Sequence, residues 1–169
     1  NPSVILVEPN IERDSALGVE WINGPMGRET LKLMGVTDKD NQPTTLQLEQ
    51  ERVQEFITGK NQLNWMISYK DKVIGAIWVD LQNSEYLKSP SIHIMLGNVN
   101  VRGQGIGTSA VESILKYLKL QGYNLVYSRY LLINAGSKKL LNNFGFEKDG
   151  ESYSDADGLQ WQNVILNIA

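Results

Sequence analysis

The sequence predicts a mixed α/β domain whose first third is mainly helical and whose remainder is rich in strands. Apolar residues recur at helical spacing up to about Thr58. From Asn64 onward they form short runs rich in β-branched and aromatic residues, bounded by turn residues. The expected order is α-α-α-β-β-β-α-β-α-β-β. The chain has 169 residues and no visible linker, so one domain over residues 1–169 is expected.

Three helices are expected before the strands. The first covers Asp14–Ile22 and stops at a glycine-proline pair, and a shorter one covers Arg28–Met34. The third follows a polar loop. Thr44 or Thr45 is a suitable N-cap for it, and its apolar pattern continues to about Thr58.

The remaining elements alternate between strands and two helices. Strands are expected at Asn64–Tyr69, Val73–Val79, Ser91–Leu96, Asn124–Leu132, Gly145–Glu147 and Gln160–Ile168. A tight hairpin at Lys70-Asp71-Lys72 joins the first two. Apolar residues three and four apart predict a long helix over Gly105–Gln121, and a shorter one is expected over Gly136–Asn143.

Composition limits the classes of function. The net charge is -3, so no global basic field favours nucleic acid as a partner. The chain has no cysteine and a single histidine, His93, which excludes thiolate nucleophiles and cysteine or histidine-rich metal sites; no metal is expected. No apolar run is long enough to cross a bilayer, and the first residues lack the basic region of a signal peptide. We therefore expect a soluble, cytoplasmic protein without a membrane partner, and a homodimer is left open.

The strongest chemical signal is the turn Arg102-Gly103-Gln104-Gly105-Ile106-Gly107. It lies between a predicted strand and a predicted helix, where free N–H groups and the helix dipole favour an anion. Its glycines remove the side chains that would keep a phosphate from the backbone, and its arginine adds a charged donor. The turn is therefore predicted to receive a phosphate or pyrophosphate.

Two common nucleotide motifs do not fit this turn. A P-loop requires a lysine after its last glycine, and Thr108 stands there instead. A dinucleotide fingerprint requires a different glycine spacing and an acidic residue about twenty positions on, but no acid occurs between Glu112 and Glu147. That stretch instead carries the basic residues Lys116, Lys119, Arg129, Lys138 and Lys139. A local positive region of this kind suits coenzyme A, which has a pyrophosphate and a ribose phosphate.

The sequence resembles the GNAT superfamily of acyl-CoA-dependent N-acetyltransferases. The turn matches the family pattern Gln/Arg-x-x-Gly-x-Gly/Ala, and Asn134-Ala135-Gly136-Ser137 followed by Gly145-Phe146 matches a second family element. The segments around the turn are most similar to the branch of ribosomal-protein N-terminal acetyltransferases. The resemblance implies a central, mostly antiparallel sheet with a splayed parallel strand pair, flanked by helices. It also implies acetyl-CoA as cosubstrate and an amine as acceptor, in a small molecule or at a peptide N-terminus.

Carried over position by position, the resemblance also implies a set of site residues. Backbone N–H groups from Gln104 to Thr108 would hold the pyrophosphate, the strand end near Leu96 would pair with the pantetheine, and Asn134 would bind the pantetheine arm. A β-bulge at Gly97 would accompany the splay of the strands. The expected cofactor-binding residues are Leu96, Asn98, Arg102, Gly103, Gln104, Gly105, Ile106, Gly107, Thr108, Asn134 and Ser137.

The catalytic residues are less well defined by the sequence. Many family members have a tyrosine on the short helix that protonates the leaving thiolate, but Leu141 stands at that position. Either Ser137 or water would take over this role; Ser137 is the candidate, although it could instead cap the helix. His93 is the candidate base, with Asp80 and Glu85 as alternatives and a structural role for the histidine also open. The leucine leaves a second hypothesis, a catalytically weak acyl-CoA-binding module with a regulatory or structural role.

Overall fold

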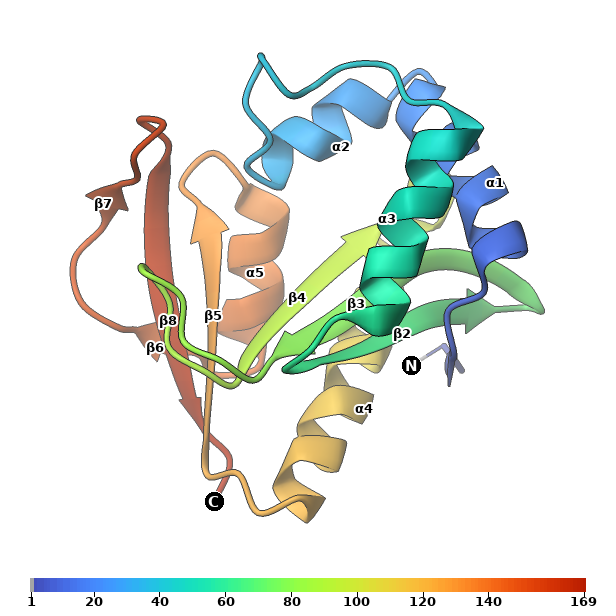
Figure 1. Ribbon diagram of the computed structural model, residues 1–169. Coiled ribbons are helices and arrows are strands. Elements are labelled where there is room, and N and C mark those ends of the chain that lie inside the picture. The colour runs from blue at the N-terminus through green and yellow to red at the C-terminus, as the bar shows by residue number, and fades with distance from the viewer. Residues whose placement is uncertain (1) are drawn as a thin grey trace.

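The computed structural model describes residues 2–169, which form one eight-stranded sheet with helices on both faces (Figure 1). The helices are α1 (Ile11–Asn23), α2 (Gly27–Leu33), α3 (Leu46–Thr58), α4 (Ile106–Leu120) and α5 (Ala135–Asn143), with a 3₁₀ turn, η1, at Val99–Val101. The strands are β1 (Ile5–Val7), β2 (Gln62–Tyr69), β3 (Lys72–Asp80), β4 (Ser91–Leu96), β5 (Leu125–Leu131), β6 (Glu147–Lys148), β7 (Tyr153–Ser154) and β8 (Gln160–Asn167). Within the described residues, no helix is both long and apolar enough to cross a bilayer.

The strand order is β1-β2-β3-β4-β5-β8-β6, with β7 also paired to β8. Every pair is antiparallel except β4 with β5. The β2–β3 hairpin turns through Lys70 and Asp71, both at positive φ (50° and 60°), as a two-residue turn of the type that matches strand twist. The expected mixed sheet with one parallel pair is therefore confirmed.

The two faces of the sheet carry different helices. On one face Trp65 of β2 meets Tyr117 of α4 edge to face, with ring centroids 5.5 Å apart. On the other face Trp78 of β3 meets Phe56 of α3, at 5.9 Å. Side chains alternate along a strand, so helices α4 and α5 cover one face and α1 to α3 cover the other, as Figure 1 shows.

The main core lies between the sheet and α4. Apolar spacing along α4 places one stripe of the helix against the strands. The best-buried members of this core come from β2, β3, α4, β5 and β8: Ile67, Ile77, Val79, Ile114, Leu118, Val126 and Val164. Burying such side chains contributes about 1.5–3 kcal/mol each. The core therefore fixes the start of α4 relative to the end of β4, which is where the predicted turn lies.

Beyond their first residues the parallel strands β4 and β5 diverge. The only backbone register between them pairs Ser91 with Tyr127, among the residues that the structure describes. One residue further on, the hydroxyl of Ser128 donates to the carbonyl of Ile92 at 2.8 Å, so a side-chain hydrogen bond takes the place of the next backbone hydrogen bond between the strands. The sheet is therefore open between the carboxyl half of β4 and β5.

The extra residue expected at Gly97 is visible in the hydrogen bonding. The β3–β4 register pairs Gly75 with Leu96, so Gly97 would come next, opposite Ile74. The amide of Asn98 donates to the carbonyl of Ile74 instead, at 3.0 Å. The chain is thus one residue out of register there, which is the arrangement of a bulge.

Several boundaries differ from the predicted ones. Strands β1 and β7 were not predicted, because they have only three and two residues. Helix α1 begins at Ile11 rather than Asp14, because the side chain of Asn10 caps it by accepting from the amide of Arg13 at 2.9 Å. The strand expected over Gly145–Glu147 is wrong in its first residues. The amide of Gly145 bonds back to Asn142 and closes the end of α5, so β6 starts only at Glu147.

Candidate active site

The bend between β4 and α4 presents an uncapped helix start. Gly103 and Gly105 have φ of 74° and 80°, in the left-handed region that side chains rarely adopt. Gly105 is the N-cap residue of α4 and has no side chain to bond the first N–H groups. By position in the helix, the amides of Ile106, Gly107 and Thr108 have no partner within α4.

Other helices of the chain are capped differently. The starts of α1, α3 and α5 are closed by the side chains of Asn10, Thr45 and Asn134. Helices α2 and α4 have no side-chain cap, but α2 has only 7 residues, whereas α4 has 15 and takes Gly105 as its N-cap residue. The start of α4 therefore offers both N–H donors and positive potential to an anion.

The residues of this bend contribute in different ways. The side chain of Ile106 is 1% exposed and belongs to the core, so only its backbone is available. A Cβ on Gly107 would approach Leu140 at 3.7 Å, an ordinary contact, whereas one on Gly105 would lie 3.3 Å from Pro2. Gln104 is exposed and donates to the carbonyl of Asn100 at 3.0 Å. The cradle is therefore formed by backbone, and the glycines at positions 103 and 105 are the two that the positive φ angles of the turn require.

The guanidinium of Arg102 is turned toward the protein. It donates twice to the carbonyl of Leu96, at 2.7 and 3.2 Å, and once to the hydroxyl of Thr30 at 2.8 Å. No carboxylate pairs with it among residues 2–169, and burial lowers the pKa of this guanidinium. The arginine therefore ties the end of β4 to α2 and leaves a partly buried positive charge beside the turn. Its expected bonds to phosphate remain a prediction.

Asn98, also expected to bind the cofactor, caps η1. Its side-chain oxygen accepts from the amide of Asn100 at 3.1 Å. Thr108 lies half-buried in the first turn of α4. Leu96, Asn98 and the Arg102–Thr108 segment thus lie along one continuous bend.

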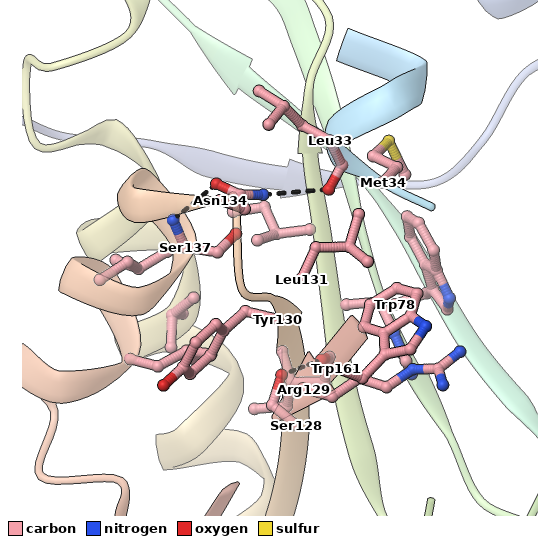
Figure 2. A pocket seen from close by; sticks show the side chains of 16 residues that line it. Leu33, Met34, Trp78, Ser128, Arg129, Tyr130, Leu131, Asn134, Ser137 and Trp161 are labelled. Atoms are coloured by element: carbon pink, nitrogen blue, oxygen red, sulfur yellow. Dashed lines mark hydrogen bonds between the residues drawn. The ribbon is translucent and has the colours of Figure 1, made fainter. Parts of the chain in front are cut away.

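A cavity of about 140 Å³ occupies the gap between β4 and β5 (Figure 2). Its lining includes Ile94 of β4, Tyr130 of β5 and Leu140 of α5. Among the predicted site residues it also includes His93, Asn134 and Ser137. The opening in the sheet therefore brings together the candidate base, the candidate acid and the asparagine of the second family element.

Asn134 joins two helices from the edge of this cavity. Its Oδ1 accepts from the amide of Ser137 at 3.0 Å and so caps α5, while its Nδ2 donates to the carbonyl of Leu33 at 3.1 Å (Figure 2). The alternative role of Ser137 as the helix cap is therefore wrong, because Asn134 holds that position. The hydroxyl of Ser137 has no hydrogen-bond partner among the described residues and lines the cavity.

Leu141 lies one turn after Ser137 on the same side of α5. It is 5% exposed and also lines the cavity. Residues four apart share a helix face, so the serine and the leucine face the same space. The hydroxyl of Ser137 is therefore the proton-carrying group that α5 presents there.

His93 is held in a pair with a carboxylate. Its Nε2 lies 3.0 Å from Oδ2 of Asp80 and 2.9 Å from the hydroxyl of Ser91. The imidazole stacks on the indole of Trp78, with ring centroids 5.5 Å apart and planes 15° apart. Because Nε2 faces the carboxylate, a neutral imidazole donates from that nitrogen and keeps its lone pair on Nδ1.

The surroundings of Asp80 favour its charged form. Burial raises the pKa of the carboxyl group, but hydrogen bonds from His93 and Gln62 and attraction to His93 lower it more, so the net shift is downward. Gln62 donates to Oδ1 at 2.5 Å. Asp80, which the sequence offered as an alternative base, is therefore placed as the partner that orients the histidine. Glu85 lies exposed on the β3–β4 loop and does not line the cavity.

The cavity lining also includes three residues that the sequence could not assign to the acceptor side of the site. Trp78, Arg129 and Trp161 line the cavity on the face of the sheet opposite α5 (Figure 2). Alternation along β5 could have indicated Arg129, since it faces away from the buried Ser128 and Tyr130.

The basic residues predicted to surround the turn are dispersed. Lys116 pairs with Glu112 at 3.2 Å, and Lys119 lies near the other end of α4. Arg129 lies on the opposite face of the sheet from α4, and only Lys138 and Lys139 belong to α5. In the part of the chain that is described, no three acidic or histidine side chains are grouped as metal ligands.

Comparison with known proteins gives a family match over most of the chain. Residues 4–147 match the model of the Acetyltransferase (GNAT) domain. An uncharacterized protein of Methanocaldococcus jannaschii is 29% identical over 103 residues, covering 59% of this chain and 21% of that protein. Human N-acetyltransferase 8B is 29% identical over 92 residues, covering 53% of this chain and 40% of that protein. The chain thus aligns with less than half the length of these curated relatives.

Solved structures with the same fold align along nearly the whole chain. An acetyltransferase of Salmonella typhimurium that modifies the N-terminal serine of ribosomal protein L7/L12 has a TM-score of 0.80 at 14% identity, covering 100% of this chain and 97% of that one. The microcin C7 self-immunity acetyltransferase MccE, solved with acetyl-CoA and AMP, has a TM-score of 0.78 at 16% identity, with coverage of 99% and 93%. Aminoglycoside acetyltransferase AAC(6')-Ib, solved with coenzyme A, has a TM-score of 0.74 at 20% identity, with coverage of 98% and 95%.

Proposed function

The chain belongs to the GNAT acetyltransferase family, and from this premise we propose that it transfers an acetyl group from acetyl-CoA directly to a primary amine. One observation carries the proposal: the uncapped start of α4 follows the end of β4. The separation of β4 from β5 opens the cavity, so the helix start and the cavity lie next to each other. This arrangement supports an anion site at the start of α4 that continues into the opening in the sheet.

The residues of the bend fit the cosubstrate. Backbone amides of Gln104 to Thr108 would hold the pyrophosphate, and the left-handed glycine at position 105 keeps side-chain atoms away from it. The strand end near Leu96 and the amide of Asn134 would bind the pantetheine arm. Bound acetyl-CoA supplies an acyl group already activated as a thioester.

His93 is proposed as the base. An amine must lose a proton to attack a carbonyl carbon, and most amines are protonated at neutral pH. The imidazole lies at the cavity with Nε2 engaged by Asp80, so Nδ1 is the nitrogen with a free lone pair. The carboxylate would stabilise the charge that the imidazole gains, as the third member of a triad does.

Ser137 is proposed as the hydroxyl that passes a proton to the leaving thiolate and takes one back from solvent, so that it ends unchanged. Its hydroxyl lines the cavity and makes no hydrogen bond to the described residues, whereas Leu141 on the same helix face cannot donate. Leu141 is also the observation that favours a second candidate function, an acyl-CoA-binding module that transfers slowly or not at all.

Two measurements test the proposal. Calorimetry should show acetyl-CoA binding, with NADH and ATP as ligands that bind much more weakly. A thiol-release assay across a panel of amines should then show release of coenzyme A that depends on the amine. Absence of acetyl-CoA binding would contradict the site itself. Binding without release for every amine would contradict transfer and support the second candidate.

A further inference from the structure

On the α2 side of the cavity, Arg129 of β5 lies over the ring of Trp161 of β8. The guanidinium carbon is 3.9 Å from the ring centroid. The β5–β8 register pairs Arg129 with Asn163 and Leu131 with Trp161, so the arginine and the tryptophan share one face of the sheet. Both line the cavity, with Trp78 nearby in Figure 2.

Trp161 is a fixed platform. Its Nε1 donates to Oδ2 of Asp155 at 2.8 Å, and the side chain is 7% exposed. The loop after α2 covers the ring so closely that a Cβ on Gly35 would lie 2.6 Å from it. The stacked guanidinium is therefore held on a surface that has little freedom to move.

Arg129 itself forms no ion pair with the described residues, although Asp155 attracts it from beyond ion-pair distance. No carboxylate lies within ion-pair distance of it among residues 2–169, and its one hydrogen bond is to the hydroxyl of Tyr153 at 3.3 Å. The nearby carboxylate of Asp155 is already engaged by Trp161 and by the amides of Asp157 and Leu159, at 2.9 and 3.0 Å. A guanidinium has five N–H donors, so most of those on Arg129 remain free.

The rest of the lining is apolar or aromatic on this side, including Leu33, Met34 and Trp78. None of the described residues that line the cavity carries a carboxylate; the carboxylates beside the lining are those of Asp80, paired with His93, and Asp155, bonded to Trp161. A polyamine would therefore place its second ammonium near the guanidinium of Arg129, where the two like charges repel each other, and would find no carboxylate within the described lining to pair with.

Building on the proposed function, we propose that Arg129 selects acceptors that carry a carboxylate or phosphate group near the amine. The guanidinium binds the anion through its paired N–H donors, and the aromatic walls hold the carbon skeleton between them. Arg129 is thus a specificity-determining residue on the acceptor side, separate from the backbone that holds the cosubstrate.

Matched acceptor pairs test this assignment. At saturating acetyl-CoA, phenylalanine is compared with phenethylamine, and O-phosphoethanolamine with ethanolamine, with putrescine as a dication. We expect kcat/KM to be at least about 10-fold higher for the anionic member of a pair, mainly through KM. The first pair reports a carboxylate site and the second a phosphate site. Equal rates within both pairs, or a preference for putrescine, would overturn the proposal.

Variants of Arg129 assign the effect to this residue. Arg129→Gln should remove the preference by lowering kcat/KM for the anionic member about 10- to 100-fold, while acetyl-CoA affinity stays unchanged. Loss of the stacking on Trp161 should lower thermal stability only slightly. Arg129→Lys should retain part of the preference for anionic acceptors, because lysine keeps the positive charge but lacks the paired N–H donors of the guanidinium. Lys148→Gln removes an exposed cation on β6 and should change nothing. A preference that survives in Arg129→Gln would contradict the role given to the arginine.

Failure of the proposed function is distinguishable from failure of this inference. If no amine supports turnover, calorimetry with each amine in the presence of coenzyme A measures the same selection as binding. Tighter binding of the anionic member by the natural chain than by Arg129→Gln would still support the inference, and equal binding by both would contradict it.

Discussion

At the scale of single residues, the site depends on pairs in which one side chain orients another. Asp80 orients His93, and Trp78 stacks against the same imidazole. Asp155 likewise holds Trp161, which supports Arg129. The proposed base and the proposed anion-binding group are therefore each held by a neighbouring side chain, an arrangement that reduces the motion of the reacting groups.

Replacing His93 tests its proposed part in proton transfer. His93→Gln retains a polar side chain that can bond to Asp80 but cannot take a proton. We expect kcat to fall about 100-fold or more, since positioned general bases contribute roughly that factor, while acetyl-CoA affinity changes little. Steady-state kinetics and calorimetry measure the two effects. A kcat within about twofold of the natural chain would assign the histidine a structural role.

Asp80 should contribute a pH-dependent part of the stability. Its pKa is lower in the folded chain than its ordinary value of 3.8, so the folded state binds this proton less readily than the unfolded state. The stabilisation is complete above about pH 4 and is lost as pH falls through the folded pKa. The difference in free energy of unfolding between the natural chain and Asp80→Asn should therefore shrink with acid. Urea unfolding at several pH values measures it, and a constant difference would contradict the shift.

At the scale of elements, the end of β4 and the start of α4 act together. Arg102 of this bend donates a hydrogen bond to Thr30 of α2, and the indole of Trp21 on α1 packs closely on Gly97. The bend therefore contacts both α1 and α2 and helps to position them. The same bend therefore presents the backbone amides at the start of α4 and holds helices α1 and α2 in place on the acceptor side of the sheet.

A glutamate in the cradle should prevent cosubstrate binding. Gly105→Glu places a carboxylate and a side chain at the start of α4, and we expect acetyl-CoA affinity to fall at least about 100-fold. Gly122→Glu is the matched control, because it adds the same charge at a glycine of positive φ (88°) with open space, beyond the other end of the same helix. Calorimetry should show normal binding by the control. Similar losses in both variants would mean that backbone strain and not position causes the effect.

A methyl group at Gly97 should push Trp21 off the end of β4. The added Cβ would lie 2.2 Å from the indole, so the ring or the strand must move, at a cost of about 1–3 kcal/mol in free energy of unfolding. Gly136→Ala is the control, since its nearest contact is 3.6 Å away on a helix, where alanine is favourable. Chemical unfolding compares them, and equal stability of the two variants would contradict the close packing of α1 on the bend.

At the scale of the whole molecule, the helices and strands that could be predicted are those with a long, regular pattern of apolar residues. Helix α4 was expected over Gly105–Gln121 and is found over Ile106–Leu120, because apolar spacing and flanking glycines are local signals. The bonds of Arg102 to Leu96 and Thr30 could not be predicted, because they depend on where the chain folds back. The same holds for the contact of Arg129 with Trp161, which joins two strands distant in the sequence.

Cosubstrate binding should be visible in the stability of the whole chain. A ligand that binds only the folded state stabilises it by about 2.7 kcal/mol at 100 times its Kd. Acetyl-CoA should therefore raise the thermal midpoint of the natural chain in a concentration-dependent manner, and Gly105→Glu should show no such rise. An equal rise in both would place the binding site elsewhere.

The two sides of the opening between β4 and β5 come from different parts of the sequence, one before Gly97 and one after α4. All residues that line the cavity from the β1–β4 side, including Trp78 and His93, precede Gly97, whereas Arg129, Asn134 and Trp161 all follow α4. The chain passes from one side to the other once, through the bend and α4. Inherited changes before Gly97 can therefore alter one wall of the cavity while the opposite wall is passed on intact. Such changes would alter the wall around the acceptor's carbon skeleton, while the anion requirement proposed for Arg129 would be inherited unchanged.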